Sequence, residues 1–135
     1  MFQLSKKVEY ALIALRYMAS GGRGRIFTTK EIADRNQLSY ELLAKIMQKL
    51  ARKGFITSQQ GVHGGYNLAR EASEVKISAV INAIEEKNVV TILQCEAGTP
   101  DDCSIHSTCT IKNPLVKLQT SINKVFDELT ILEMV

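Results

Sequence analysis

The sequence predicts a mainly α-helical fold with one small β-hairpin, and three observations lead to this prediction. Apolar residues recur at helical spacing in three segments between residues 6 and 54. Two short strand-like segments on either side of a glycine-rich stretch come next. Near the C-terminus, leucine, isoleucine and valine repeat every three or four residues, as in a long helix. Helices followed by a hairpin in this order are typical of a winged helix-turn-helix, here with an added C-terminal helix.

The first two helices have recognisable ends. Ser5 is a suitable N-cap for a helix over residues 6–20, whose apolar residues share one face until a pair of glycines ends the pattern. Thr28 and Glu31 have the spacing of a capping box, in which each side chain accepts a hydrogen bond from the other residue's backbone. We therefore expect the second helix to begin after Thr28 and to end near Asn36.

A third helix of about fourteen residues is expected after Ser39, because Gly54 suits the left-handed position that closes a helix. Its expected buried face consists of Leu42, Leu43, Ile46 and Leu50. Its polar face consists of Lys45, Gln48, Lys49 and Arg52. The short interval before this helix sets it at a steep angle to the second one. The third helix is therefore expected to enter a DNA major groove with its N-terminal residues nearest the bases.

A hairpin is expected to form the wing. Residues 55–58 and 66–68 are strand-like, and residues 59–65 between them contain three glycines. The second helix, the third helix and the wing together supply the predicted DNA contacts. These are Thr28, Lys30, Ser39, Tyr40, Glu41, Lys45, Lys49, Arg52, Gln60, His63 and Gly64.

Charge is distributed unevenly along the chain. Residues 1–70 carry twelve Lys and Arg against four acidic residues, a formal charge of +8. Residues 71–135 carry five Lys against ten acidic residues, a formal charge of −5. Two ordinary solvated surfaces are one explanation of this asymmetry. The other is that the basic half binds a polyanion such as DNA, which agrees with the predicted fold.

The sequence does not have the features of an exported protein, a membrane protein or an enzyme. No segment is suited to export or to crossing a bilayer, so we expect a cytoplasmic protein with no membrane partner. An enzyme is not expected, because the sequence contains neither a glycine-rich phosphate cradle nor a paired-carboxylate motif. The two histidines, His63 and His106, fall in the wing tip and among the cysteines.

The second half of the chain is expected to form a helix, a loop and a last helix. Ser78 is expected to cap a fourth helix that reaches Glu86. Asn113 and Pro114 have the order of a cap and a first helical residue, which predicts a last helix over residues 114–132. This division predicts a DNA-binding domain at 1–72 and a second region at 73–135, with a cysteine loop at 95–109.

The seam of the last helix alternates by three and four residues, which is the a/d pattern of a coiled coil. Packing inside one chain is an alternative, but the small basic domain offers little surface for so long a helix. We therefore expect a symmetric homodimer, which also matches a palindromic operator. The expected interface residues are Leu115, Leu118, Ile122, Val125 and Leu129.

The three cysteines, Cys95, Cys103 and Cys109, lie within fifteen residues of one another. Thiolates are soft ligands that select zinc, copper(I) or iron–sulfur clusters. With His106 the segment has the ligand count of a Cys3His zinc site, but it lacks the paired C-x2-C spacing of structural zinc. The wider spacing favours a cluster weakly, and thiol redox chemistry without a metal remains open.

Over essentially its whole length the sequence resembles the Rrf-type winged-helix iron–sulfur transcriptional regulators. The matching stretches are residues 8–12 (VEYAL), 38–43 (LSYELL) and 61–68 (GVHGGYNL), together with the cysteines and the long last helix. Residues 103–112 are nearer to the nitric-oxide-sensitive branch of that family. The resemblance implies a DNA-binding regulator, expected to be a repressor. Its operator affinity would depend on a 2Fe–2S or 4Fe–4S cluster that senses nitric oxide, redox state or iron–sulfur status.

The resemblance also implies the ligands, since the three cysteines hold the cluster in that family. The fourth ligand varies. The histidine that one branch uses is replaced here by Lys112, whereas the acidic residue that the nitric-oxide-sensitive branch supplies from the partner subunit matches Glu9. His106 is the alternative fourth ligand. The wing arginine of many relatives is Gln60 here. A zinc-binding or thiol-redox regulator without a cluster is the second functional hypothesis.

Overall fold

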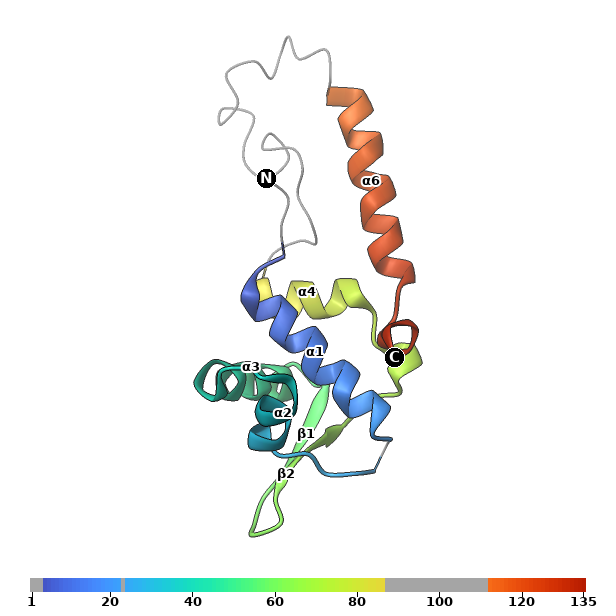
Figure 1. The fold of residues 1–135 in the computed structure, drawn as a ribbon. Helices are drawn as coiled ribbons and strands as arrows, with labels where there is room; N and C mark the ends of the chain where they lie inside the picture. The colour runs from blue at the N-terminus through green and yellow to red at the C-terminus, as the bar shows by residue number, and fades with distance from the viewer. Residues whose placement is uncertain (1–3, 23, 87–111) are drawn as a thin grey trace.

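The computed structural model of the chain describes residues 4–22, 24–86 and 112–135 (Figure 1). The described elements are α1 (Lys6–Ser20), α2 (Thr29–Asn36), α3 (Tyr40–Arg52), β1 (Ile56–Gln59), β2 (Gly65–Leu68), the 3-10 helix η1 (Ala72–Glu74), α4 (Ile77–Glu85), α6 (Lys112–Glu128) and the 3-10 helix η3 (Ile131–Met134). The predicted mainly helical fold with one antiparallel hairpin is confirmed. None of the helices in these described residues is both long and apolar enough to cross a membrane.

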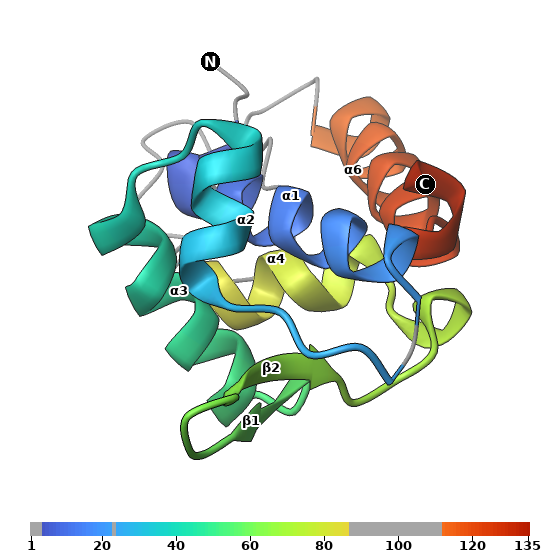
Figure 2. The same cartoon turned by 60° about the horizontal axis from the view of Figure 1, so that its bottom comes forward.

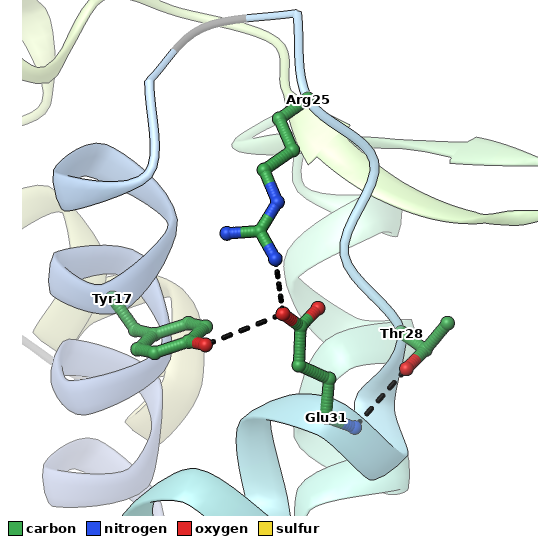
Figure 3. Close-up of polar contacts among 4 residues, drawn as sticks. All are labelled: Tyr17, Arg25, Thr28 and Glu31. Carbon is green, nitrogen blue, oxygen red and sulfur yellow. Dashed lines mark hydrogen bonds and ion pairs between the residues drawn. The ribbon is translucent and has the colours of Figure 1, made fainter.

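The first helix ends were predicted correctly from local signals. Ser5 caps α1, because its hydroxyl accepts a hydrogen bond from the backbone of Val8 at 3.3 Å. At α2 the Thr28 hydroxyl accepts from the backbone of Glu31 at 3.0 Å. The Glu31 carboxylate turns instead toward Arg25 and the Tyr17 hydroxyl (Figure 3). The predicted capping box is therefore formed from the Thr28 side only.

The hydrophobic core is built around α1, which crosses the middle of the molecule (Figure 2) and contacts α2, α3, α4 and η3. Ala11 and Ala14 are fully buried, and their small side chains let neighbouring helices approach α1 closely. In α3 the buried face includes Met47, whereas Leu42, which we expected there, is half-buried. Buried residues from both sides of residue 72 share this one core.

The hairpin is anchored to the chain before α2. β1 and β2 pair antiparallel, from Ile56 opposite Leu68 to Gln59 opposite Gly65. Phe27 forms an isolated antiparallel bridge with β2, because its N–H and carbonyl exchange two hydrogen bonds of 2.7 Å with Tyr66. At Gly65 a Cβ would lie 2.5 Å from the Phe27 carbonyl oxygen, so only glycine allows this approach.

Replacing Gly65 by Ala should therefore destabilise the domain. The added methyl group would push the wing away from Phe27, and overpacking of this kind costs about 1–3 kcal/mol. Urea unfolding followed by circular dichroism would measure the loss. Ser58→Ala, an exposed position on β1, is the matched control and should stay within about 0.5 kcal/mol of the wild type. Equal stabilities of Gly65→Ala and the control would show that the wing is not tied to Phe27.

Two predicted helix boundaries are wrong. Ser78 does not cap α4, because it lies inside the first turn, where it is buried, and the N-cap position is Lys76. The last helix spans Lys112–Glu128 rather than 114–132. After Glu128 the backbone pairs with residues 75–77: the Leu129 carbonyl accepts from Ile77 at 3.0 Å, and Ile131 donates to Val75 at 2.9 Å. Ile131 is buried in the core, which holds residues 129–131 against residues 75–77.

Candidate functional site

The N-terminal end of α3 is exposed and is positioned by α1. Ser39, Tyr40 and Glu41 are all exposed there, as the sequence predicts for residues that read bases. The Ser39 hydroxyl makes no capping hydrogen bond. Its backbone N–H instead donates to the Tyr10 hydroxyl at 3.1 Å. Tyr10 of α1 therefore fixes where the recognition end of α3 begins.

The polar face of α3 divides into two parts. Lys45, Gln48 and Arg52 are exposed and point away from the core. Lys49 is turned toward α4, and only 24% of its side chain is exposed. Its ammonium donates to the carbonyl oxygen of Ile84 at 2.8 Å and lies 3.3 Å from the Glu86 carboxylate. The charge of Lys49 is thus paired within the chain.

The start of α2 is held by a cluster of polar and aromatic side chains (Figure 3). The Glu31 carboxylate pairs with the Arg25 guanidinium and accepts a hydrogen bond of 3.3 Å from the Tyr17 hydroxyl. The Arg25 guanidinium also lies 4.5 Å from the centre of the Phe27 ring, whose edge packs on Tyr17. These contacts fasten α2 to α1 and leave Thr28 and Lys30 exposed beside α3.

The wing tip presents an exposed apolar residue that the sequence reasoning missed. Gln60 and His63 are exposed as predicted, but among the large hydrophobic residues that the structure describes Val62 is the most exposed, at 97%. Its position between Gly61 and Gly64, in the glycine-rich tip, was the available signal. Gly64 has a steric role, because a Cβ there would overlap the Gln59 carbonyl oxygen. A hollow of about 410 Å³ separates the wing from α3 and is lined by Gln48, Ala51, Arg52, Ser58, Gln60 and Tyr66.

The beginning of α1 and the end of α4 meet at one end of the molecule. The Ser5 hydroxyl donates to the Glu85 carboxylate. Glu9 is exposed one turn further along α1 and borders a shallow hollow of about 300 Å³. The three cysteines and His106 lie outside the described residues. Within residues 4–22, 24–86 and 112–135, no three His, Cys, Asp or Glu side chains are grouped so that they could hold a metal ion.

The last helix carries an exposed apolar seam. On α6, Leu118 and Val125 are exposed, and Leu115 and Ile122 are half-buried; Leu129 is exposed just after the end of the helix. An adjoining apolar hollow of about 290 Å³ is lined by Ser121, Ile122, Val125 and Phe126. Figure 1 shows α6 extending beyond the packed body of α1–α4. Most of the predicted seam therefore does not contribute to the core of its own chain.

Comparisons with known proteins cover nearly the whole chain. A family model described as "Rrf2: Iron-dependent Transcriptional regulator" matches residues 4–135. Among solved structures, CymR (YrzC), the global cysteine regulator of B. subtilis, is 23% identical with a TM-score of 0.76, over 99% of this chain and 96% of that one. T. potens IscR is 25% identical with a TM-score of 0.72, over 98% and 85%. The oxidized form of Staphylococcus aureus CymR is 25% identical with a TM-score of 0.69, over 96% and 92%.

Proposed function

Because the chain belongs to the Rrf2 family of transcriptional regulators, we propose that it is a homodimeric repressor whose operator affinity is controlled by an iron–sulfur cluster. The observation that carries the DNA-binding part is the placement of α3. Its apolar face is buried, while its N-terminal end and the side chains of Lys45 and Arg52 are exposed. A helix held in this way can enter a major groove with the wing beside it.

Within this proposal the exposed residues have separate roles. Tyr40 and Glu41, at the start of α3, read base edges. Thr28 and Lys30 at the start of α2, together with Lys45 and Arg52, contact phosphates, which fix the register without reading sequence. The wing tip approaches the minor groove, where an apolar side chain such as Val62 can pack against the groove wall.

A second copy of the chain is the proposed occupant of the α6 seam. The exposed seam residues recur at the spacing of a coiled coil, and three of the four residues that line the α6 hollow are apolar. Pairing of two α6 helices about a two-fold axis would bury this seam and place two recognition helices on one palindromic site. The five predicted interface residues, from Leu115 to Leu129, are retained in this proposal.

The residues present suit an iron–sulfur cluster. Cysteine thiolates, commonly four, are the usual protein ligands of such a cluster, and the three cysteines of this chain leave one position for a weaker ligand. The Glu9 carboxylate is exposed at the edge of a hollow, where it is accessible to a group on the partner subunit. When bound, the cluster would supply reactivity toward oxidants and nitric oxide. In this proposal the cysteines retain it, and Glu9 links it to α1 and, through Tyr10, to the start of α3.

Thiol chemistry without a cluster is the second candidate. Of the three solved structures named above, two are CymR proteins. One is called a global cysteine regulator, and the other was solved in an oxidized form. The cysteines of this chain could likewise respond as thiols, or bind zinc with His106 as the fourth ligand. The two candidates share the DNA-binding surface and differ only at the cysteine segment.

Replacing Lys45 or Arg52 by Ala should weaken binding to all duplex sequences. The slope of log affinity against log salt is negative, and each phosphate contact that is lost should reduce its magnitude by about 0.9, because fewer counterions are released. Fluorescence anisotropy with random-sequence duplex DNA at several salt concentrations measures this slope. Lys124→Ala, an exposed change on α6, is the control and should leave the slope unchanged.

Tyr40→Ala or Glu41→Ala should instead change the sequences recovered from a random duplex pool, with little effect on the salt slope. If the wild type binds selected duplexes no better than an unrelated polyanion in any redox state, the proposed function is wrong.

A further inference from the structure

The recognition helix is joined to α4 by a contact that its own sequence pattern does not suggest. Lys49 lies on the polar face of α3, yet its ammonium donates to the Ile84 carbonyl in the last turn of α4. The carbonyls at the end of a helix lack partners within it, and a cation placed there is favourable. Lys49 therefore caps the end of α4 from a neighbouring helix.

The residue at this end of α4 has an unusual backbone. Glu86 adopts a left-handed conformation with a φ of 56°, which non-glycine residues seldom adopt. Its carboxylate lies 3.3 Å from the Lys49 ammonium. The neighbouring Glu85 accepts the hydrogen bond from Ser5 of α1. Contacts from α3 and α1 thus hold two successive residues at the end of α4.

We propose that Lys49 is a positioning residue that couples the recognition helix to the chain leaving α4, and that it does not contact DNA phosphates. Cys95, the first cysteine, is nine residues after Glu86 in the sequence. If a change of state at the cysteines displaces the end of α4, the Lys49 contact would pass this displacement to α3. The Tyr10–Ser39 hydrogen bond holds the other end of α3, so the helix tilts about its recognition end. This inference rests on the proposed function.

Lys49→Met tests the coupling, because methionine keeps much of the apolar stem and removes the charge. Lys45→Met, one turn earlier and exposed, is the matched control. For random-sequence duplex DNA, the magnitude of the salt slope should stay at the wild-type value in Lys49→Met. In Lys45→Met it should decrease by about 0.9. An equal fall in both variants would overturn the inference, because it would make Lys49 a phosphate contact.

The second readout is the ratio of DNA affinities between anaerobic protein and protein oxidised with hydrogen peroxide, which attacks clusters and thiols alike. In the wild type this ratio should be roughly 5–150, as for other coupled sites. It should approach 1 in Lys49→Met and keep its wild-type value in Lys45→Met. Glu86→Gln should also lower the ratio, by a smaller amount, because the hydrogen bond from Lys49 to Ile84 remains. The double variant should show no further loss than Lys49→Met, because that change already removes the ion pair with Glu86. A full ratio in Lys49→Met would overturn the coupling.

Hydrogen exchange separates this inference from the proposed function, since it needs neither DNA nor a cofactor. The backbone amides at positions 85 and 86 should exchange faster in Lys49→Met and in Glu86→Gln than in the wild type or in Lys45→Met. Unchanged exchange in both variants would overturn the role of Lys49 even if redox control of DNA binding is intact. If wild-type protein binds DNA with equal affinity in both redox states, the proposed control by the cysteines is wrong. The salt slope and the exchange rates then still decide whether Lys49 contacts DNA or holds the end of α4.

Discussion

Cys103→Ala should abolish cluster binding and, with it, the dependence of DNA affinity on redox state. With one thiolate removed, only Cys95, Cys109 and a weaker ligand remain, and cluster irons are held chiefly by thiolates. Wild-type protein purified without oxygen should be brown or red and should contain iron and acid-labile sulfide. The variant should be colourless, with iron and sulfide reduced at least about tenfold, because losing even a residue that only orients a metal ligand costs about 10–100-fold in affinity. Absorption spectra and elemental analysis measure both quantities.

Two further variants are the controls and identify the fourth ligand. His106→Ala lies in the same segment and should keep the wild-type spectrum. Glu9→Gln should keep the cluster but shift its absorption bands and weaken the effect of oxidation on DNA binding. The reverse pattern would make His106 the fourth ligand and Glu9 a surface carboxylate that interacts with the start of α1. Colourless wild-type protein, with zinc or without metal, would favour the thiol or zinc candidate instead.

Val125→Glu should convert the dimer into monomers and remove most of the specific DNA affinity. In a two-fold interface the new carboxylate would be buried near its own copy, which is strongly unfavourable. A monomer engages one half-site, so the gain from linking two sites, on the order of 10²–10⁴ in affinity, is lost. Val125 is 54% exposed in the single chain, so the change should leave the fold intact. Light scattering after size exclusion gives the mass, and anisotropy gives the affinity.

The choice of Val125 follows from the structure. Ile122→Glu is the obvious change from the sequence, but Ile122 is half-buried beside Phe126, which packs on the core. Thr120→Glu is the control, since Thr120 is exposed on the side of α6 away from the seam and should keep the dimer. If Val125→Glu retains the dimer mass, the seam does not form the interface.

The predicted fold was largely correct because its signals are local. Ser5 and Thr28 each cap a helix through a backbone N–H three residues further on. Gly54 adopts the positive φ expected of a residue that closes a helix. Interactions of this range depend on short stretches of chain, so residue order alone identifies them. The wing was predicted for the same reason, with strand ends displaced by about one residue.

Longer-range contacts decided the remaining features. Glu31 has the right spacing for a capping box, but Arg25 and Tyr17 compete for its carboxylate. The heptad pattern continues past Glu128, yet backbone pairing with residues 75–77 ends the helix there. Spacing along one segment does not contain this information, because the competing partners come from other elements.

By itself, therefore, the sequence determined the helix order, the wing, the exposed start of α3 and the three clustered cysteines. The tertiary structure decided what the polar side chains of these elements do. Tyr10 bonds to a residue 29 positions away, and Lys49 to one 35 positions away. In the sequence Lys49 is equivalent to Lys45 and Arg52, three basic residues on one helix face. Only the packing of α4 against α3 turns Lys49 toward the end of α4, where the free carbonyls and the negative end of the helix dipole favour a cation.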